Sequence, residues 1–363
     1  MERPPVPLTL LAAAVLALTG CSADAGAPRT AAVSPSATAS APAQNEAGMG
    51  PAALESAYER VISNVLPSIV QINTRTGLGS GVIYDASGHI VTNAHVVGRA
   101  TEFQVTLATG GAPRRARLVE SFPLGDLAVI KVDDPSGLRP AKFGDSGRLR
   151  VGQIVLAMGN PLGLGSSVTD GIVSALGRTV TEPSESGSPG ATITNAVQTS
   201  AAINPGNSGG ALVNLAGEVI GIPTLAATVP ELGGGAAPGI GFAIPSNTAT
   251  DIARQIVENG SVTNTRRAAL GVSVRTVIGA DGRPAGVGVV DVSEGGGAAQ
   301  AGIEPGDIIT SVNGTQTPST QALSEVLATL RPGGQAEVGL LRLDGSTATV
   351  TVRLGELPTS TSE

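Results

Sequence analysis

The sequence is poor in the residues that several classes of protein require. It has a single cysteine, Cys21, so an intramolecular disulfide is impossible. With only two histidines beside that cysteine, we expect no Cys/His structural zinc site, and nothing else in the sequence implies a metal or another cofactor. Aromatic residues make up 2% of the chain and apolar residues 41%, so the cores must be built from aliphatic side chains.

Positive charge is also scarce. The 22 lysines and arginines are outnumbered by 29 acidic residues, and the net charge of −7 argues against a nucleic-acid partner. The 363 residues fit about two domains with tails. The 50 glycines and 25 prolines predict many turns and a mostly β fold.

The N-terminus has the features of an export signal. Leu8 to Leu18 is an almost unbroken apolar run, too short to span a bilayer comfortably but of the right length for a signal-peptide core. It ends in Leu18-Thr19-Gly20-Cys21, which resembles a bacterial lipoprotein box with cleavage before Cys21 and a lipid on its sulfur. The alternative is an ordinary signal peptide with an incidental cysteine. Residues 1–21 therefore predict an extracytoplasmic protein held to the bacterial cell membrane by lipid on Cys21.

The composition then divides the chain into segments. An Ala-, Ser-, Thr- and Pro-rich stretch predicts a disordered tether, and a helix with Leu54, Tyr58, Val61 and Val65 on one face should follow and end at Pro67. Short β-branched segments come next, among them predicted strands at Ile69–Ile72, His89–Thr92 and Leu127–Val132. A helix over Thr248–Glu258, capped by Ser246 and Asn247 and closed by Asn259-Gly260, ends that region. The boundaries are a tether at 22–51, a first domain at 52–262, a second at 263–357 and a disordered tail at 358–363.

The most informative segment is Asn204-Pro205-Gly206-Asn207-Ser208-Gly209-Gly210. A nucleophilic serine needs a tight turn, so that its hydroxyl projects and backbone N–H groups point at the developing oxyanion. The glycines beside Ser208 permit that turn. Taken alone, the segment fits a plain glycine-rich hairpin equally well.

Two further residues complete a candidate catalytic set. His95 follows a predicted strand, where a lone histidine would more often be packed in a core; the other histidine, His89, sits in a Ser-Gly turn and should face solvent. Asp126 opens an apolar strand, where a carboxylate is costly unless it is paired, although a solvated turn aspartate is an equal alternative. The order His95, Asp126, Ser208 is that of the chymotrypsin arrangement.

Longer strings surround these residues, namely Gly79–Ile83, Thr92–Val97, Asp126–Val129, Ala201–Leu212 and Gly239–Pro245. In the C-terminal part the strings are Ala269–Val274, Gly297–Ile309 and Ser311–Gly314. Together they resemble one family over Leu54 to about Gly355, the HtrA/DegP-type serine proteases with a C-terminal PDZ domain. The resemblance implies a chymotrypsin-like double β-barrel over 52–262, followed by a small α+β PDZ domain over 263–357. It also implies that His95, Asp126 and Ser208 are catalytic.

The resemblance assigns the remaining site residues. The backbone around Gly206, Asn207 and Ser208 should form the oxyanion hole. The pocket for the side chain before the scissile bond should be small and apolar, with the Gly233–Ala236 stretch as a mobile loop beside it; its residues are Ile203, Thr224, Leu225, Ala226, Ile240, Gly241 and Phe242. Pro223 departs from the polar residue usual in relatives.

In the C-terminal part, Ala269-Leu270-Gly271-Val272 should be the PDZ loop that holds a peptide carboxylate, and a helix over Thr320–Leu330 should form the opposite wall. The resulting prediction is a serine endopeptidase that cleaves misfolded or unfolded extracytoplasmic proteins and recognises their C-termini, in a possible homotrimer. A PDZ-based peptide-binding chaperone or scaffold with little proteolysis is the alternative from another class. A signalling protease that cuts one membrane-bound regulator would share the chemistry.

Overall fold

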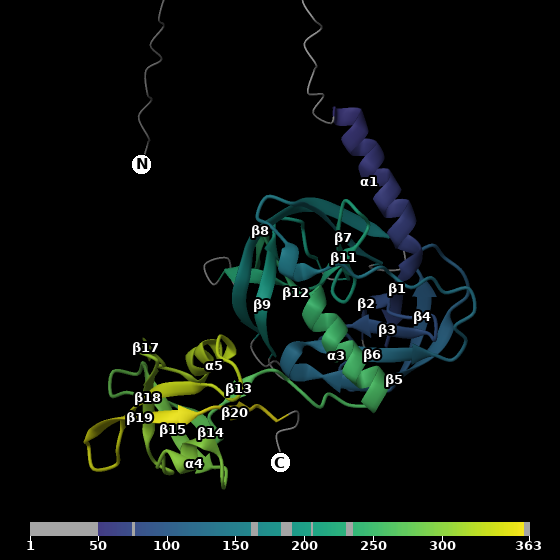
Figure 1. Cartoon of the computed structure of the whole chain (residues 1–363). Helices are drawn as coiled ribbons and strands as arrows, with labels where there is room; N and C mark the ends of the chain where they lie inside the picture. Colours follow the sequence, from purple (N-terminus) through teal and green to yellow (C-terminus); the bar gives the residue numbers. More distant parts are fainter. Residues whose placement is uncertain are drawn as a thin grey trace, which may run out of the picture. The chain divides into compact units, whose positions relative to one another are not determined.

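The computed structural model of the chain describes residues 50–74, 77–160, 166–182, 191–204, 206–229 and 235–358 (Figure 1). The predicted leader and tether with Cys21, the residues Pro205, Gly233 and Gly234, and the tail beyond residue 358 lie outside this range. Among the described residues, no helix has the length and apolar character needed to cross a bilayer.

The first part of the chain forms a closed antiparallel barrel with the strand order β1-β2-β3-β6-β5-β4. Its core consists of β-branched and leucine-like side chains, including Ile72, Ile83 and Ile130, all with no exposed surface. The strands are β1 (Ile69–Asn73), β2 (Leu78–Ile83), β3 (His89–Thr92), β4 (Glu102–Leu107), β5 (Arg114–Phe122) and β6 (Leu127–Val132).

A second closed antiparallel barrel follows, with the order β10-β11-β12-β9-β8-β7. One apolar cluster contains residues of both barrels, for example Val91 and Val129 from the first and Met158 and Ile222 from the second. The two barrels are therefore packed against each other through a common core. The strands are β7 (Ile154–Gly159), β8 (Ser167–Glu182), β9 (Ala191–Thr199), β10 (Ala211–Asn214), β11 (Val219–Val229) and β12 (Gly235–Pro245).

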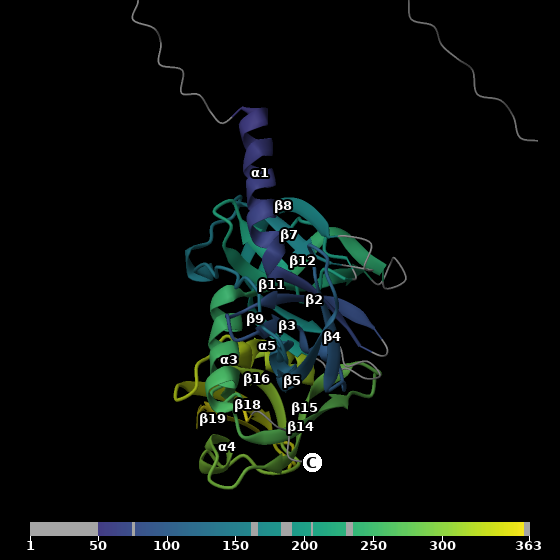
Figure 2. The ribbon, with the colours of Figure 1, turned by 90° about the vertical axis from the view of Figure 1, so that its right-hand side faces the viewer.

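Helices lie at both ends of the barrel pair. In α1 (Pro51–Val65) every fourth residue is buried, namely Ala57, Val61 and Val65, and the amino end of the helix points away from the barrels (Figure 2). As predicted, the chain leaves the helix around Pro67, which lies in a 3₁₀ turn at Leu66–Ser68.

The helix α3 (Ser246–Asn259) confirms the second predicted helix and closes at Gly260, whose φ is 74°. The predicted cap was wrong, because the N-cap position is Pro245 and the backbone N–H of Asn247 donates to the hydroxyl of the distant Ser146 at 3.1 Å. The hydroxyl of Ser246 instead donates to the carbonyl of Gly144 at 2.7 Å, which ties the start of the helix to the barrels.

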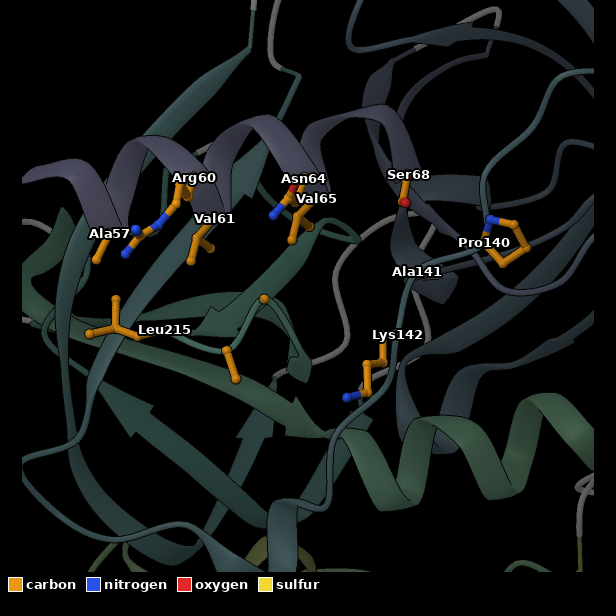
Figure 3. Close-up of a pocket in the computed structure, with 12 residues that line it drawn as sticks. Ala57, Arg60, Val61, Asn64, Val65, Ser68, Pro140, Ala141, Lys142 and Leu215 are labelled. Atoms are coloured by element: carbon orange, nitrogen blue, oxygen red, sulfur yellow. The ribbon is translucent and has the colours of Figure 1, made fainter.

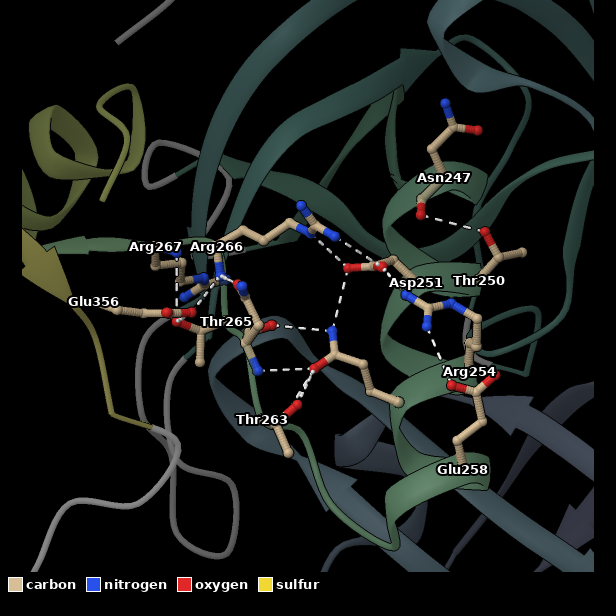
Figure 4. A network of polar contacts seen from close by, with 12 residues as sticks. Asn247, Thr250, Asp251, Arg254, Glu258, Thr263, Thr265, Arg266, Arg267 and Glu356 are labelled. Carbon is tan, nitrogen blue, oxygen red and sulfur yellow. Dashed lines mark hydrogen bonds and ion pairs between the residues drawn. The ribbon is translucent and has the colours of Figure 1, made fainter. Parts of the chain in front are cut away.

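The segment after α3 is fixed to that helix by polar contacts (Figure 4). Asp251 accepts hydrogen bonds from Arg266 Nε at 2.7 Å and from Arg254 at 2.8 Å. The amide oxygen of Gln255 accepts from the backbone N–H groups of Thr263 and Asn264, at 3.0 and 2.8 Å. The segment that connects the two predicted domains is thus held against α3 by these hydrogen bonds and is not a free linker.

The C-terminal domain has its own aliphatic core, which includes Leu270, Val287, Ile309, Leu323 and Val338. Its main sheet has the order β14-β15-β16-β18-β19 with β17 beside β16, and β13 pairs with β20. The elements are β13 (Ala268–Ala269), β14 (Val272–Ile278), β15 (Pro284–Val292), α4 (Gly297–Gln300), β16 (Ile308–Val312), β17 (Thr315–Gln316), α5 (Thr320–Ala328), β18 (Gln335–Leu341), β19 (Thr347–Arg353) and β20 (Gly355–Glu356). The predicted fold, two barrels followed by a small α+β domain, is confirmed.

Candidate active site

His95 lies in α2 (Ala94–Val97), a single helical turn that directly follows β3. The imidazole Nδ1 is 3.0 Å from Oδ1 and 2.9 Å from Oδ2 of Asp126, and the backbone N–H of His95 donates to the same Oδ1 at 3.0 Å. A carboxylate in this position fixes which imidazole nitrogen carries the proton, so that Nε2 is left as the proton acceptor.

Asp126 occupies the residue between a 3₁₀ turn at Pro123–Gly125 and β6, with a left-handed φ of 51°. The backbone carbonyl of Asp126 accepts a hydrogen bond from Asn93 Nδ2 at 2.9 Å, which helps to hold this conformation. The residue is 2% exposed, and its carboxylate also accepts a hydrogen bond from the Thr224 hydroxyl. The buried charge is therefore fully surrounded by donors, as a buried carboxylate requires.

Ser208 stands on a turn that leads into β10. The turn requires glycine because Gly206 has a φ of 104° and Gly209 a φ of 80°. The Ser208 hydroxyl donates to the carbonyl of Thr224 at 3.0 Å; within the described residues it makes no hydrogen bond with His95. Thr224 thus joins the serine, through its carbonyl, to the aspartate, through its hydroxyl.

The backbone of the same turn supplies candidate donors for an oxyanion. The N–H of Asn207 is already donated to the carbonyl of Asn204 at 3.0 Å, and the N–H of Gly209 to the carbonyl of Pro223 at 3.0 Å. No hydrogen bond between described residues takes the N–H of Gly206 or of Ser208. Two amides two residues apart therefore remain available to a substrate oxygen.

The site is assembled from both barrels. His95 and Asp126 come from the first, and Ser208 and Thr224 from the second. The part played by the Thr224 hydroxyl was missed, because the sequence places Thr224 only in the substrate pocket and gives no local sign of a contact with a residue 98 positions away.

The expectation that His89 faces solvent was wrong. His89 opens β3 and is only 8% exposed, and its Nδ1 lies 2.6 Å from Asp85 Oδ2. Burial raises the pKa of Asp85, but the hydrogen bonds from the side chain and backbone of His89 and from the Ser87 N–H together bring that pKa below its ordinary value. This second His–Asp pair closes the turn before β3, since Asp85 caps the backbone there.

Most residues predicted for the specificity pocket lie on the neighbouring strands β11 and β12 of the second barrel, whereas Ile203 lies in the loop that follows β9. Phe242 pairs with Leu225 and Gly241 with Ala226 across β11 and β12. Ile203 and Phe242 are buried, whereas Ile240 is 38% exposed. A Cβ at Gly241 would lie 2.4 Å from Cγ1 of Ile203, so the close approach of these two residues requires glycine.

Pro223 and part of the predicted Gly233–Ala236 loop lie in strands of the second barrel. Pro223 sits in β11 opposite Ala243, and its carbonyl holds the N–H of Gly209 in the serine turn. Gly235 and Ala236 belong to β12, paired with Val229 and Thr228, so the predicted mobile loop does not include them.

The predicted carboxylate loop of the C-terminal domain connects β13 to β14. Gly271 has a φ of 80°, and the carbonyls of Leu270 and Gly271 accept hydrogen bonds from Ala298 and Ser293, both at 2.9 Å. The wall predicted opposite is α5, which begins at Thr320 as expected, after an N-cap at Ser319, but ends at Ala328. Thr276 of β14 accepts the N–H of Thr320 at 3.1 Å, so the start of α5 is joined to the edge of that strand.

A separate pocket of about 320 Å³ lies beside α1 (Figure 3). Arg60 and Asn64 of the helix and Lys142 border it, with Leu215 below. Lys142 is paired with Glu218 at 2.8 Å, so one of the two cations is already neutralised. In the described residues no group of three or more His, Cys, Asp or Glu side chains could hold a metal ion.

Comparison with known proteins matches both domains. The model of the trypsin-like peptidase domain matches residues 79–222, and that of the PDZ domain residues 268–354. The periplasmic pH-dependent serine endoprotease DegQ of Escherichia coli is 44% identical over 274 residues, which are 73% of this chain and 57% of DegQ. The serine protease PepD of Mycobacterium tuberculosis is 38% identical over 337 residues, 89% of this chain and 70% of PepD.

Solved structures give the same result. The HtrA-type protease AlgW with a decapeptide is 34% identical with a TM-score of 0.57, and the match covers 83% of this chain and 99% of AlgW. The serine endoprotease of Yersinia pestis is 37% identical with a TM-score of 0.56, over 83% of this chain and 98% of that one. This chain spans little more than half the length of its Escherichia coli relatives.

Proposed function

This chain belongs to the HtrA-type family of serine endoproteases, and on that premise we propose that it cleaves peptide bonds in unfolded or misfolded proteins with His95, Asp126 and Ser208. The observation that carries the proposal is the contact of His95 Nδ1 with both carboxylate oxygens of the buried Asp126, beside a serine on a glycine turn. Neither a scaffold nor a chaperone needs that arrangement.

The reaction would proceed in two halves, the acylation of Ser208 and the hydrolysis of the acyl-enzyme. The Ser208 hydroxyl rotates from the carbonyl of Thr224 toward His95, and its oxygen attacks the substrate carbonyl carbon as His95 Nε2 takes the proton. When the peptide C–N bond breaks, His95 returns that proton to the leaving amine. A water molecule then attacks the acyl-enzyme carbonyl as His95 takes a proton from it, and His95 gives that proton to the Ser208 oxygen when the acyl C–O bond breaks. Asp126 stabilises the imidazolium in both halves of the reaction.

The oxyanion formed in both halves of the reaction would be held by the N–H groups of Gly206 and Ser208, which carry no other described hydrogen bond. Asn207, with its N–H bound to Asn204, shapes the turn instead. The substrate backbone would need the carbonyl of Thr224 as an acceptor, and its arrival would release the Ser208 hydroxyl from that carbonyl.

The closeness of Ile203 to Gly241 and the burial of Phe242 support a shallow apolar pocket. We expect small aliphatic side chains, such as valine or alanine, before the scissile bond. The loop at Ala269–Val272 would take a C-terminal carboxylate, and the added peptide would extend β14.

The test of the activity is Ser208→Ala. We expect loss of casein cleavage on the order of a millionfold in turnover, with the fold unchanged. A fluorophosphonate probe should label the parent protein and not the variant. Labelling that persists in Ser208→Ala, or cleavage that survives it, would reject the assignment and leave the PDZ-based scaffold as the better reading.

Location and assembly are further proposals. The relatives named above include a periplasmic enzyme, which supports an extracytoplasmic site, and lipid on Cys21 would hold the protein at the membrane. Cys21→Ala should move the protein from the detergent phase to the aqueous phase in a Triton X-114 partition. A homotrimer would give the region from Pro51 onward three times its monomer mass in light scattering.

A further inference from the structure

Ser80, a residue of the first barrel, makes direct contact with the oxyanion turn of the second. It lies in β2 and has no exposed surface. The Ser80 hydroxyl donates to the carbonyl of Gly206 at 2.5 Å and accepts the backbone N–H of Asn160, which follows β7, at 2.8 Å. One hydroxyl therefore donates to one segment of the other barrel and accepts from a second.

The backbone of Ser80 holds the same turn at a second point. Its N–H donates to the carbonyl of Ser208 at 2.9 Å, and its own carbonyl accepts the Thr92 hydroxyl at 2.7 Å. The backbones of Ser80 and Gly209 are in close contact, because a Cβ at Gly209 would lie 2.2 Å from the carbonyl oxygen of Ser80.

We propose that Ser80 is a positioning residue that holds the oxyanion-binding amide of Ser208 in its catalytic orientation. The inference rests on the proposed peptidase function. A peptide unit is planar, so the hydrogen bond to the Gly206 carbonyl fixes the plane that this carbonyl shares with the N–H of Asn207. The hydrogen bond to the Ser208 carbonyl likewise fixes the plane shared with the N–H of Gly209. The peptide plane that holds the N–H of Ser208 lies between these two. Between those two anchors the N–H of Ser208 has little freedom to turn.

The chemical consequence is specific to the transition state. Oxyanion donors act only when they lie 2.7 to 3.1 Å from the position that the negatively charged oxygen takes up, a requirement that ground-state binding does not impose. Removing the Ser80 hydroxyl would leave the Gly206 carbonyl and the Asn160 N–H unpaired in a buried place, and both groups would shift to find partners.

The variant Ser80→Ala tests this role, with Ser121→Ala as the matched control. Ser121 also has a buried hydroxyl, but that hydroxyl has no hydrogen-bond partner among the described residues. Turnover would be measured per active site, counted by fluorophosphonate titration, together with KM and the inhibition constant of a peptide boronic acid, whose tetrahedral adduct places an oxygen in the oxyanion site.

For Ser80→Ala we expect kcat per site to fall by about 10- to 30-fold with KM within about threefold, and the boronate inhibition constant to rise by the same factor as kcat falls. Ser80→Cys, with a weaker donor of similar size, should lie between, and it keeps the test open if the alanine variant does not fold. Ser121→Ala should match the parent within about twofold.

Two results would overturn the inference while the parent enzyme remains active: an unchanged kcat per titrated site, or a lower kcat with unchanged boronate binding, which would mean that Ser80 only joins the barrels. A parent protein without Ser208-dependent hydrolysis would instead remove the proposed function itself.

Discussion

Thr224 offers the sharpest test of how the catalytic aspartate is held. Its hydroxyl donates to Asp126 Oδ2, while its carbonyl accepts the Ser208 hydroxyl. Thr224→Val keeps the shape and the carbonyl and removes only the hydroxyl. The threonine is 3% exposed, so water cannot easily replace the lost donor.

The expected magnitude follows from the donors that remain. Asp126 would keep the backbone N–H and Nδ1 of His95 and lose one charge-assisted hydrogen bond, typically worth about 1.5 to 3 kcal/mol. If that loss is expressed as misplacement of the carboxylate at the transition state, kcat falls by about 10- to 150-fold, since 1.4 kcal/mol is about tenfold. KM should hardly change, because Thr224→Val keeps the carbonyl that we propose as an acceptor for the substrate backbone.

The assay is hydrolysis of a chromogenic peptide at neutral pH, with sites counted by fluorophosphonate titration. Thr224→Ser should restore most of the rate, because it restores the donor. Thr181→Val is the control: the Thr181 hydroxyl is buried and has no partner in the described part of the chain, so its removal should leave kcat within about twofold. A Thr224→Val enzyme as fast as the parent would show that the bond to Asp126 has no catalytic role.

Two further predictions concern stability. Gly209→Ala combines a φ of 80° with a Cβ placed 2.2 Å from the Ser80 carbonyl, so we expect a loss of more than about 3 kcal/mol in urea unfolding; Gly217→Ala, with a φ of 73° and its nearest neighbour at 3.7 Å, should lose only about 1 to 2 kcal/mol, and equal losses would refute the steric argument. The pKa of Asp251 is lowered from 3.8, chiefly by its hydrogen bond with Arg266, so its contribution is present above pH 3.8 and is lost as the pH falls through the lower folded value. The difference in urea midpoint between the parent and Asp251→Asn should therefore be constant near neutral pH and shrink below about pH 4; a difference independent of pH would contradict this.

Local patterns in the sequence were enough for most of the elements that position the site. The runs at Ile69, His89 and Leu127 are strands because β-branched residues fit a buried pleated surface, and these strands were confirmed with nearly the predicted bounds. The serine turn was also readable, since Gly206 and Gly209 both need the positive φ that glycine allows.

Long-range pairing was beyond such patterns. The contact between Thr224 and Asp126 and the burial of His89 depend on which strands become neighbours in a closed barrel, and a histidine after Ser-Gly looks like any exposed turn residue. The predicted cap of α3 failed for a similar reason. Serine is a residue type common at helix N-caps, but the Ser246 hydroxyl donates to the carbonyl of Gly144 in a distant loop.

The division of the chemistry between two barrels has a consequence for how this molecule responds to heat. The proposed base and its carboxylate lie in the first barrel and the proposed nucleophile in the second, and Ser80 of the first barrel contacts the serine turn of the second. A small separation of the two barrels would abolish peptide cleavage while the strands within each barrel stay paired. We expect activity to be lost at a lower temperature than that of unfolding and to return on cooling. The protein would then be inactive before it unfolds and can be cleaved by other copies of itself.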